Sequence, residues 1–168
     1  WRKGTSRVSW SHDDIRDQEA PMNIENIDHI GIRVADLDRA MAFYELFGFK
    51  VVHKADNDPV AVVKNADDVE LNLVFNANDD NGGENILMDI PTKYPGFTHV
   101  AFRVNSILET VETLQTNNIS ITQGPVKFGR DGHVSVFVRD PDRNTIEFRG
   151  REEDLSSIGG VETYENEN

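Results

Sequence analysis

The 168-residue chain contains no cysteine. This absence excludes disulfide frameworks, thiolate nucleophiles, zinc fingers and cysteine-ligated iron–sulfur clusters. Any metal ion must therefore be held by imidazole, carboxylate, amide or water ligands. Long apolar runs are also missing, and none approaches the roughly 20 residues that cross a bilayer. We therefore expect no membrane-spanning segment and no membrane partner.

Positive charge is scarce, since 17 lysines and arginines face 30 aspartates and glutamates, which gives a formal net charge of −13. A surface this acidic repels phosphate backbones, so we expect no nucleic-acid partner. Apolar residues make up 38% of the chain, enough for a real core. At this length we expect one domain, or two small repeats that share a core.

The two ends differ in composition from the middle. Residues 1–21 hold both tryptophans but show no apolar period, and we interpret them as an N-terminal extension. They lack the basic head, apolar run and small-residue cleavage site of a signal peptide, so we expect a cytoplasmic protein. Residues 151–168 contain six acidic residues and one basic residue. We expect this acidic tail to be solvated, or else to cap an interface. The working domain is then residues 22–150.

The domain repeats itself. Segment 27–34 aligns without gaps with segment 97–104, and both have the alternating apolar residues of a β-strand. An amphipathic stretch follows each strand, with Asp36 and Ser106 as predicted N-caps of two helices. Each helix leads into a further strand, at 49–53 and 119–121.

The second halves of the repeats also match. Segment 63–73 aligns without gaps with segment 138–148, and both have the strand, polar turn and strand of a hairpin. The sequence thus predicts an α+β fold with two βαβββ modules, residues 25–76 and 97–150, which form a curved mixed sheet with helices outside. The connecting loop 77–96 is long, which suggests a lid, a dimer contact or a plain surface loop.

A candidate metal site follows from the repeat. His29 and His99 occupy the same position in the first strand of each module, and Glu147 lies mid-strand between two apolar residues. Because strand residues alternate between faces, Glu147 points away from its apolar neighbours. Pseudo-symmetry brings these three residues together with Asn72, the repeat partner of Glu147. Two imidazoles and a carboxylate with open positions can bind a divalent metal and polarise substrate oxygens.

Several segments resemble the vicinal-oxygen-chelate superfamily, which includes glyoxalase I, fosfomycin-resistance thiol transferases, methylmalonyl-CoA epimerase, extradiol dioxygenases and bleomycin-binding proteins. The opening Asp-His-Ile-Gly-Ile at 28–32, with segments 36–44 and 47–49, resembles its first module. Segments 98–104, 124–127 and 140–148 resemble its second module, most like that of lactoylglutathione lyases. The resemblance implies a homodimeric, metal-dependent glyoxalase-like enzyme, a lyase or isomerase, that chelates two neighbouring oxygens of a small substrate.

The resemblance also implies roles for individual residues. His29, His99 and Glu147 fall on metal-ligand positions, and Glu147 is the only aligned base. In glyoxalase I a glutamate on the fourth strand is the fourth ligand. The gapless repeat alignment places Asn72 there, while Glu70, two residues away on the same face, could take the position after a register shift. The metal could be nickel, zinc, manganese or iron.

Other reactions stay open because the remaining triad is also the pattern of thiol transferases and extradiol dioxygenases. The dioxygenases carry a tyrosine ten residues before the metal glutamate, where this chain has Phe137. Against a thiol transferase, the sequence shows no clear basic cluster for a phosphonate, although Lys127 and Arg130 lie in one loop. We assign these three residues and His133 as candidate substrate-binding residues. A rival from another class is a metal-free, drug-sequestering dimer that binds small molecules.

Overall fold

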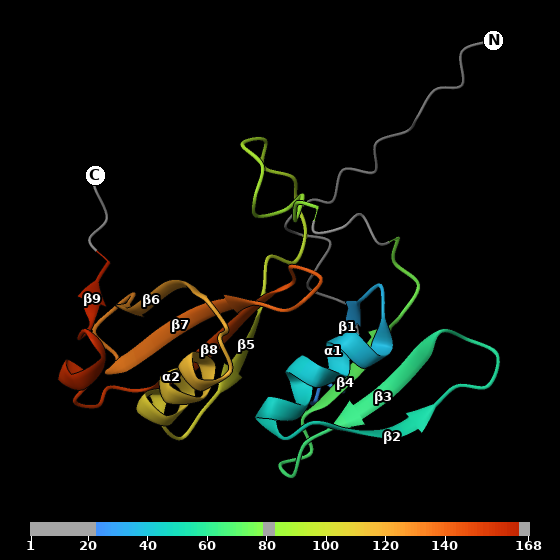
Figure 1. The fold of residues 1–168 in the computed structure, drawn as a ribbon, viewed down its shortest axis with the longest axis horizontal. Helices are drawn as coiled ribbons and strands as arrows, with labels where there is room; N and C mark the ends of the chain where they lie inside the picture. The colour runs from blue at the N-terminus through green and yellow to red at the C-terminus, as the bar shows by residue number, and fades with distance from the viewer. Residues whose placement is uncertain (1–22, 79–82, 165–168) are drawn as a thin grey trace, which may run out of the picture.

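The computed structural model describes residues 23–78 and 83–164 and has the predicted α+β fold with two βαβββ modules (Figure 1). The first module forms a mixed sheet with strand order β1-β4-β3-β2, in which β1 runs parallel to β4. Its elements are β1 (Ile30–Arg33), α1 (Leu37–Tyr44), the 3-10 helix η1 (Glu45–Phe47), β2 (Lys50–Lys54), β3 (Val60–Lys64) and β4 (Glu70–Val74).

The second module repeats this order and adds a short edge strand, which gives a mixed sheet with order β5-β8-β7-β6-β9. Its elements are β5 (Val100–Arg103), α2 (Ile107–Thr116), β6 (Ile121–Lys127), β7 (His133–Arg139), β8 (Thr145–Arg151), the 3-10 helix η2 (Ser156–Ile158) and β9 (Glu162–Thr163). The two modules lie side by side, each with its own sheet (Figure 1). No helix among the described residues has the length and apolarity to cross a bilayer.

Both predicted helix N-caps are confirmed. Asp36 Oδ1 accepts a 2.7 Å hydrogen bond from the Arg39 N–H, and Ser106 Oγ accepts a 3.0 Å hydrogen bond from the Glu109 N–H. These contacts satisfy backbone donors that the first helical turn leaves without partners. Each helix buries one face, formed by Ala40, Met41, Phe43 and Tyr44 in α1 and by Ile107, Thr110, Val111 and Leu114 in α2.

The strand register agrees with the internal repeat. In the first module Gly31 lies opposite Asn72, and in the second Ala101 lies opposite Glu147. The gapless alignments of the repeats also place Gly31 on Ala101 and Asn72 on Glu147. Asn72 is therefore the structural counterpart of Glu147, as the sequence predicts.

Helix α1 and the β7–β8 turn join the two modules. The Tyr44 hydroxyl donates a 2.9 Å hydrogen bond to Oδ2 of the buried Asp140. Oδ1 of Asp142 accepts hydrogen bonds from the Ala35 N–H and from Arg39, at 3.0 and 2.7 Å. Burial, together with the nearby Asp140 carboxylate, raises the pKa of Tyr44 well above its usual value, so its hydroxyl remains a donor. One apolar core extends through both modules.

Segment 151–168, which the sequence predicts to be solvated or to cap an interface, is mostly exposed in its described part but is attached to the second module. Leu155 is only 2% exposed, and β9 pairs with β6. Oε2 of Glu153 accepts a 2.8 Å hydrogen bond from the Leu108 N–H in the first turn of α2. Leu155, with Ile158 and Val161 packed against the same core, and the Glu153 carboxylate anchor this otherwise acidic segment, because they fill the core and satisfy a free helix donor. The predicted extension 1–21 lies outside the described residues.

Candidate functional site

His99 and Glu147 form a close pair in the second module. His99 directly precedes β5, and its Nε2 lies 3.1 Å from Oε2 of Glu147 on the neighbouring strand β8. The other carboxylate oxygen, Oε1, accepts a 2.6 Å hydrogen bond from the buried Ser135 hydroxyl on β7. The Glu147 side chain is thus buried and held at both oxygens, which fixes one carboxylate beside one imidazole.

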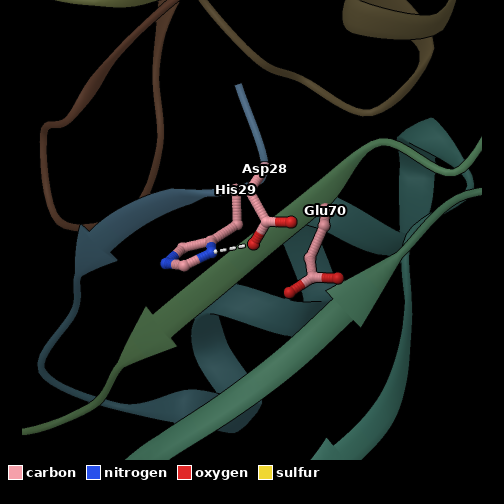
Figure 2. A group of neighbouring side chains, drawn as sticks. All are labelled: Asp28, His29 and Glu70. Carbon is pink, nitrogen blue, oxygen red and sulfur yellow. Dashed lines mark hydrogen bonds and ion pairs between the residues drawn. The ribbon is translucent and has the colours of Figure 1, made fainter. Parts of the chain in front are cut away.

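His29 holds the corresponding place in the first module, directly before β1. The ligand atoms of Asp28, His29 and Glu70 all lie within 4.8 Å of one another (Figure 2). His29 Nδ1 contacts Oδ2 of Asp28 at 2.9 Å. Glu70 Oε2 also lies 3.0 Å from the ammonium of Lys64 on β3. A cation at His29 would therefore share Glu70 with a lysine.

The residue before each histidine fixes its ring in the same way. Asp28 contacts Nδ1 of His29 at 2.9 Å, and Thr98 contacts Nδ1 of His99 at 3.0 Å. A partner on one ring nitrogen sets the orientation of the imidazole and leaves the other nitrogen for a metal. The Nε2 atom is therefore the remaining ring nitrogen of both histidines, and in His99 it faces Oε2 of Glu147.

Asn72 meets one requirement of a ligand. Its Oδ1 atom is buried and has no hydrogen-bond partner. Such an oxygen is costly unless a donor or a cation satisfies it, so its environment fits a metal ligand. Glu70 nevertheless lies in the His29 group without any register shift, because the pairing of β1 with β4 is regular. Both residues therefore stay candidates for the fourth ligand.

Among the described residues of one chain, the side chains around His29 and those around His99 form two separate groups. Within residues 23–78 and 83–164, the only cluster of three or more His or carboxylate groups close enough to share a metal ion is Asp28, His29 and Glu70. His99 and Glu147 make a second, separate pair. Both histidines line one open cavity of about 1290 Å³ between the modules. The structure thus presents two half-sites that face a common space.

The candidate substrate-binding residues lie at different distances from this centre. The ring of Phe137 packs edge-on to His99, with centroids 5.6 Å apart, and also contacts Phe128. Lys127 pairs with Glu152, and Arg130 is exposed in the loop after β6. These assignments stay predictions.

His133 belongs to a cluster of charged residues that the sequence does not predict. Its Nε2 contacts Arg103 on β5, and its Nδ1 lies 3.3 Å from Oδ2 of Asp131. Asp131 in turn pairs with Arg149 on β8. The available signal was strand alternation, because Arg103 follows His99 by four residues and Arg149 follows Glu147 by two.

The connecting loop is attached to the β7–β8 hairpin through one carboxylate. Oδ1 of Asp89 lies 2.7 Å from Arg139, and Oδ2 accepts hydrogen bonds from Arg143 at 2.7 and 2.9 Å. The Asn85 N–H donates a further hydrogen bond to Asp89, at 2.9 Å. Loop residues 84–87 line the cavity. The Asp89 contacts therefore anchor the loop beside the residues that line the cavity.

We expect Asp89→Asn to destabilise the protein by about 1–3 kcal/mol, because the arginines lose a charged acceptor. Burial favours a higher pKa for Asp89, but the Asn85 and Arg143 hydrogen bonds and the charges of Arg139 and Arg143 outweigh it and lower the pKa below 3.8. The stabilisation is therefore present above the ordinary pKa and is lost as the pH falls through the lower, folded-state value.

Urea unfolding of the wild type and of Asp89→Asn at several pH values measures this difference. The gap should be constant near neutral pH and should shrink in acid below about pH 4. Asp58→Asn, in the exposed turn before β3, is the matched control. An equal loss of stability in both variants would contradict the assigned role of Asp89.

Comparison with known proteins agrees with the fold. The family model of the glyoxalase/bleomycin resistance protein/dioxygenase superfamily matches residues 26–148. A lactoylglutathione lyase of Arabidopsis thaliana is 36% identical over 129 residues, which cover 71% of this chain and 42% of that protein. The chain thus spans less than half the length of this relative.

For two further proteins, the matched region covers most of their own length. A virulence protein of Salmonella typhimurium is 31% identical over 130 residues, which cover 75% of this chain and 84% of that protein. The crystal structure of a glyoxalase/dioxygenase from Nostoc punctiforme superposes with a TM-score of 0.63 at 22% identity, covering 83% of this chain and 99% of that one. The chain belongs to the glyoxalase/bleomycin resistance protein/dioxygenase superfamily.

Proposed function

We propose that the protein is a metal-dependent, glyoxalase-like lyase or isomerase that acts on a small substrate with two neighbouring oxygens. The observation that carries this proposal is the 3.1 Å contact between His99 and Glu147, together with His29 at the repeat-equivalent position. The lactoylglutathione lyases among its relatives support the same reaction class.

The residues present fit a divalent metal ion. His29 and His99 would supply Nε2, Glu147 a carboxylate oxygen, and Asn72 or Glu70 the fourth protein oxygen. This donor set suits nickel, zinc, manganese or iron. When bound, the ion would polarise the two substrate oxygens and favour negative charge on them.

Glu147 is the proposed catalytic base. It is the carboxylate beside His99, and the Ser135 hydroxyl holds its second oxygen in place. A carboxylate fixed at this position can take a proton from a substrate carbon next to the chelated oxygens. Asn72 is an uncharged amide and cannot act as a base, so of the two repeat-equivalent residues only Glu147 can carry the proton transfer.

We also propose that a second copy of the chain completes the site. The two half-sites do not share a metal-sized cluster among the described residues. Around the cavity that they face, Phe97 is 97% exposed, and Ile27 and Ile86 are also exposed. Apolar side chains gathered at the rim of a cavity are typical of an interface. A homodimer would cover these residues and bring His29 of one protomer to His99 of its partner.

Metal analysis combined with an activity assay tests the proposal. We expect native mass spectrometry to show a stoichiometric divalent ion, and the metal-loaded protein to convert the hemithioacetal of glutathione and methylglyoxal. Stoichiometric iron with activity only toward catechols would indicate a ring-cleaving dioxygenase. Adduct formation between a thiol and an electrophile would indicate a thiol transferase. A protein that binds no divalent ion would overturn the enzyme proposal and favour the metal-free binding dimer.

We expect Asn72→Glu to raise metal affinity by about tenfold or more, because a carboxylate replaces a neutral amide next to the ion. The same variant should move the activity toward that of glyoxalase I. Calorimetric titration with nickel or zinc measures the affinity. Asn57→Glu adds the same charge in an exposed turn and serves as the control. If Glu70→Gln removes metal binding and Asn72→Glu changes nothing, Glu70 is the fourth ligand.

A further inference from the structure

We propose that Arg103 and Arg149 form an oxyanion-binding subsite beside the His99–Glu147 pair, and that the substrate is a small organic acid with a carboxylate or phosphoryl group. The inference rests on the proposed function, since this subsite would hold the anionic end of the substrate whose vicinal oxygens are chelated. It names a substrate class that the half-sites alone leave open.

The strand register places the two arginines together. Arg103 on β5 lies opposite Arg149 on β8, and Arg149 lies opposite Ser135 on β7. Arg149 follows Glu147 by two residues, so both side chains leave the same face of the sheet. Two cations in directly opposite positions of neighbouring strands repel each other. An anion bound between them would remove that cost.

Arg149 is held in position by neutral and charged partners. Its Nη1 donates a 3.1 Å hydrogen bond to Ser135 Oγ, and its Nη2 lies 2.5 Å from Oδ2 of Asp131. Ser135 also donates to Glu147, so one hydroxyl fixes both the proposed base and the guanidinium. A guanidinium held in this way loses little freedom when it binds a ligand.

Arg103 keeps its charge available. In the part of the chain that the structure describes, no carboxylate forms an ion pair with it, and its contact is with Nε2 of His133. A guanidinium only donates, so Nε2 of His133 is the acceptor in this contact. Asp131 is shared between Arg149 and His133. Two guanidinium groups here face the carboxylates of Asp131 and Glu147, on a chain of net charge −13, and Arg103 is the one with no carboxylate partner among the described residues.

The subsite lies close enough to the half-site for one small molecule to reach both. Arg149 Nη1 is 3.9 Å from Oε1 of Glu147. Next to them, Phe137 packs on His99 and on Phe128, and Phe128 also contacts Tyr164. The ligand that fits these groups has chelating oxygens at His99, an oxyanion at Arg103 and Arg149, and a short apolar body along the aromatic side chains.

Calorimetric titration of the metal-free, full-length chain with inorganic phosphate and with malonate, at fixed ionic strength, tests the subsite. We expect both anions to bind, and Arg103→Gln to weaken the tighter one by about tenfold or more. Arg149→Gln should do the same, and Arg103→Lys should lie between because it keeps charge but not the forked geometry. Asp131→Asn should strengthen binding, because it removes a competing carboxylate.

Lys50→Gln is the matched control, because Lys50 is exposed on β2 in the other module and the substitution removes the same charge. It should change anion affinity by less than about twofold. Equal effects of Lys50→Gln and Arg103→Gln, or no binding of either anion by the wild type, would overturn the subsite. Preference for phosphate or for malonate tells which oxyanion the substrate carries.

Metal titration of the same proteins separates this inference from the proposed function. Arg103→Gln should bind the divalent ion as the wild type does, because Arg103 is not a proposed ligand. If the wild type binds anions through Arg103 but binds no metal, the proposed function fails and the subsite stands. If metal and activity are present but anion affinity is independent of Arg103, the subsite is wrong and the proposed function stands.

Discussion

Replacement of His99 by alanine is expected to lower metal affinity by at least about 100-fold, with no loss of fold. His99 supplies one of two proposed imidazole ligands and is partly exposed before β5, so its removal leaves the core intact. His29→Ala should have the same effect because the two residues are repeat-equivalent. Metal analysis, with circular dichroism to follow the fold, measures the outcome.

His53→Ala is the control for these variants, since His53 is exposed on β2 in a strand that contributes no proposed ligand. It should keep the full metal content of the wild type. Full occupancy in either His29→Ala or His99→Ala would mean that the two half-sites do not serve one ion.

Mixing the two inactive variants gives a sharper test of the dimer. If a site takes His29 from one protomer and His99 from its partner, a mixed dimer has one intact site and one that lacks both histidines. Random exchange of protomers should then restore about a quarter of the wild-type sites. A site closed within each chain would regain nothing on mixing. Metal content and activity after exchange therefore distinguish the two arrangements.

Asp140→Ala should destabilise the protein by about 3–5 kcal/mol, the range for breaking a buried charged network. The buried Asp140 carboxylate accepts hydrogen bonds from the Tyr44 hydroxyl, from the backbone N–H of Asp142, and from both the backbone and the side chain of Asn144. Its loss leaves these donors unsatisfied and removes a contact between the modules. Urea unfolding measures the change in free energy.

Two further variants should lose less unfolding free energy than Asp140→Ala. Tyr44→Phe removes one donor and no packing, so about 1–2 kcal/mol should be lost. Asp56→Ala removes a carboxylate from an exposed turn and should cost less than about 0.5 kcal/mol. If Asp140→Ala were no worse than Asp56→Ala, the network would not hold the modules together.

The amino-acid sequence alone determines the modular plan of this protein. Strand alternation and helical spacing are local signals, and the internal repeat aligns them into two βαβββ units. Asp36 and Ser106 are found as caps because a cap acts on the helix that follows it. The equivalence of Asn72 and Glu147 is also predictable, because a gapless repeat fixes the register of both parallel pairs.

Only the tertiary structure decides the contacts between segments that are distant in sequence. Asp89 meets Arg139 and Arg143, and Leu155 enters the core, although neither has a periodic pattern around it. Arg103 lies opposite Arg149 because of the register of β5 on β8. That register cannot be predicted from the positions of two charged residues on separate strands. The separation of His29 from His99 likewise depends on how the modules pack. Such contacts are set by packing and charge across the fold, which local periodicity does not encode.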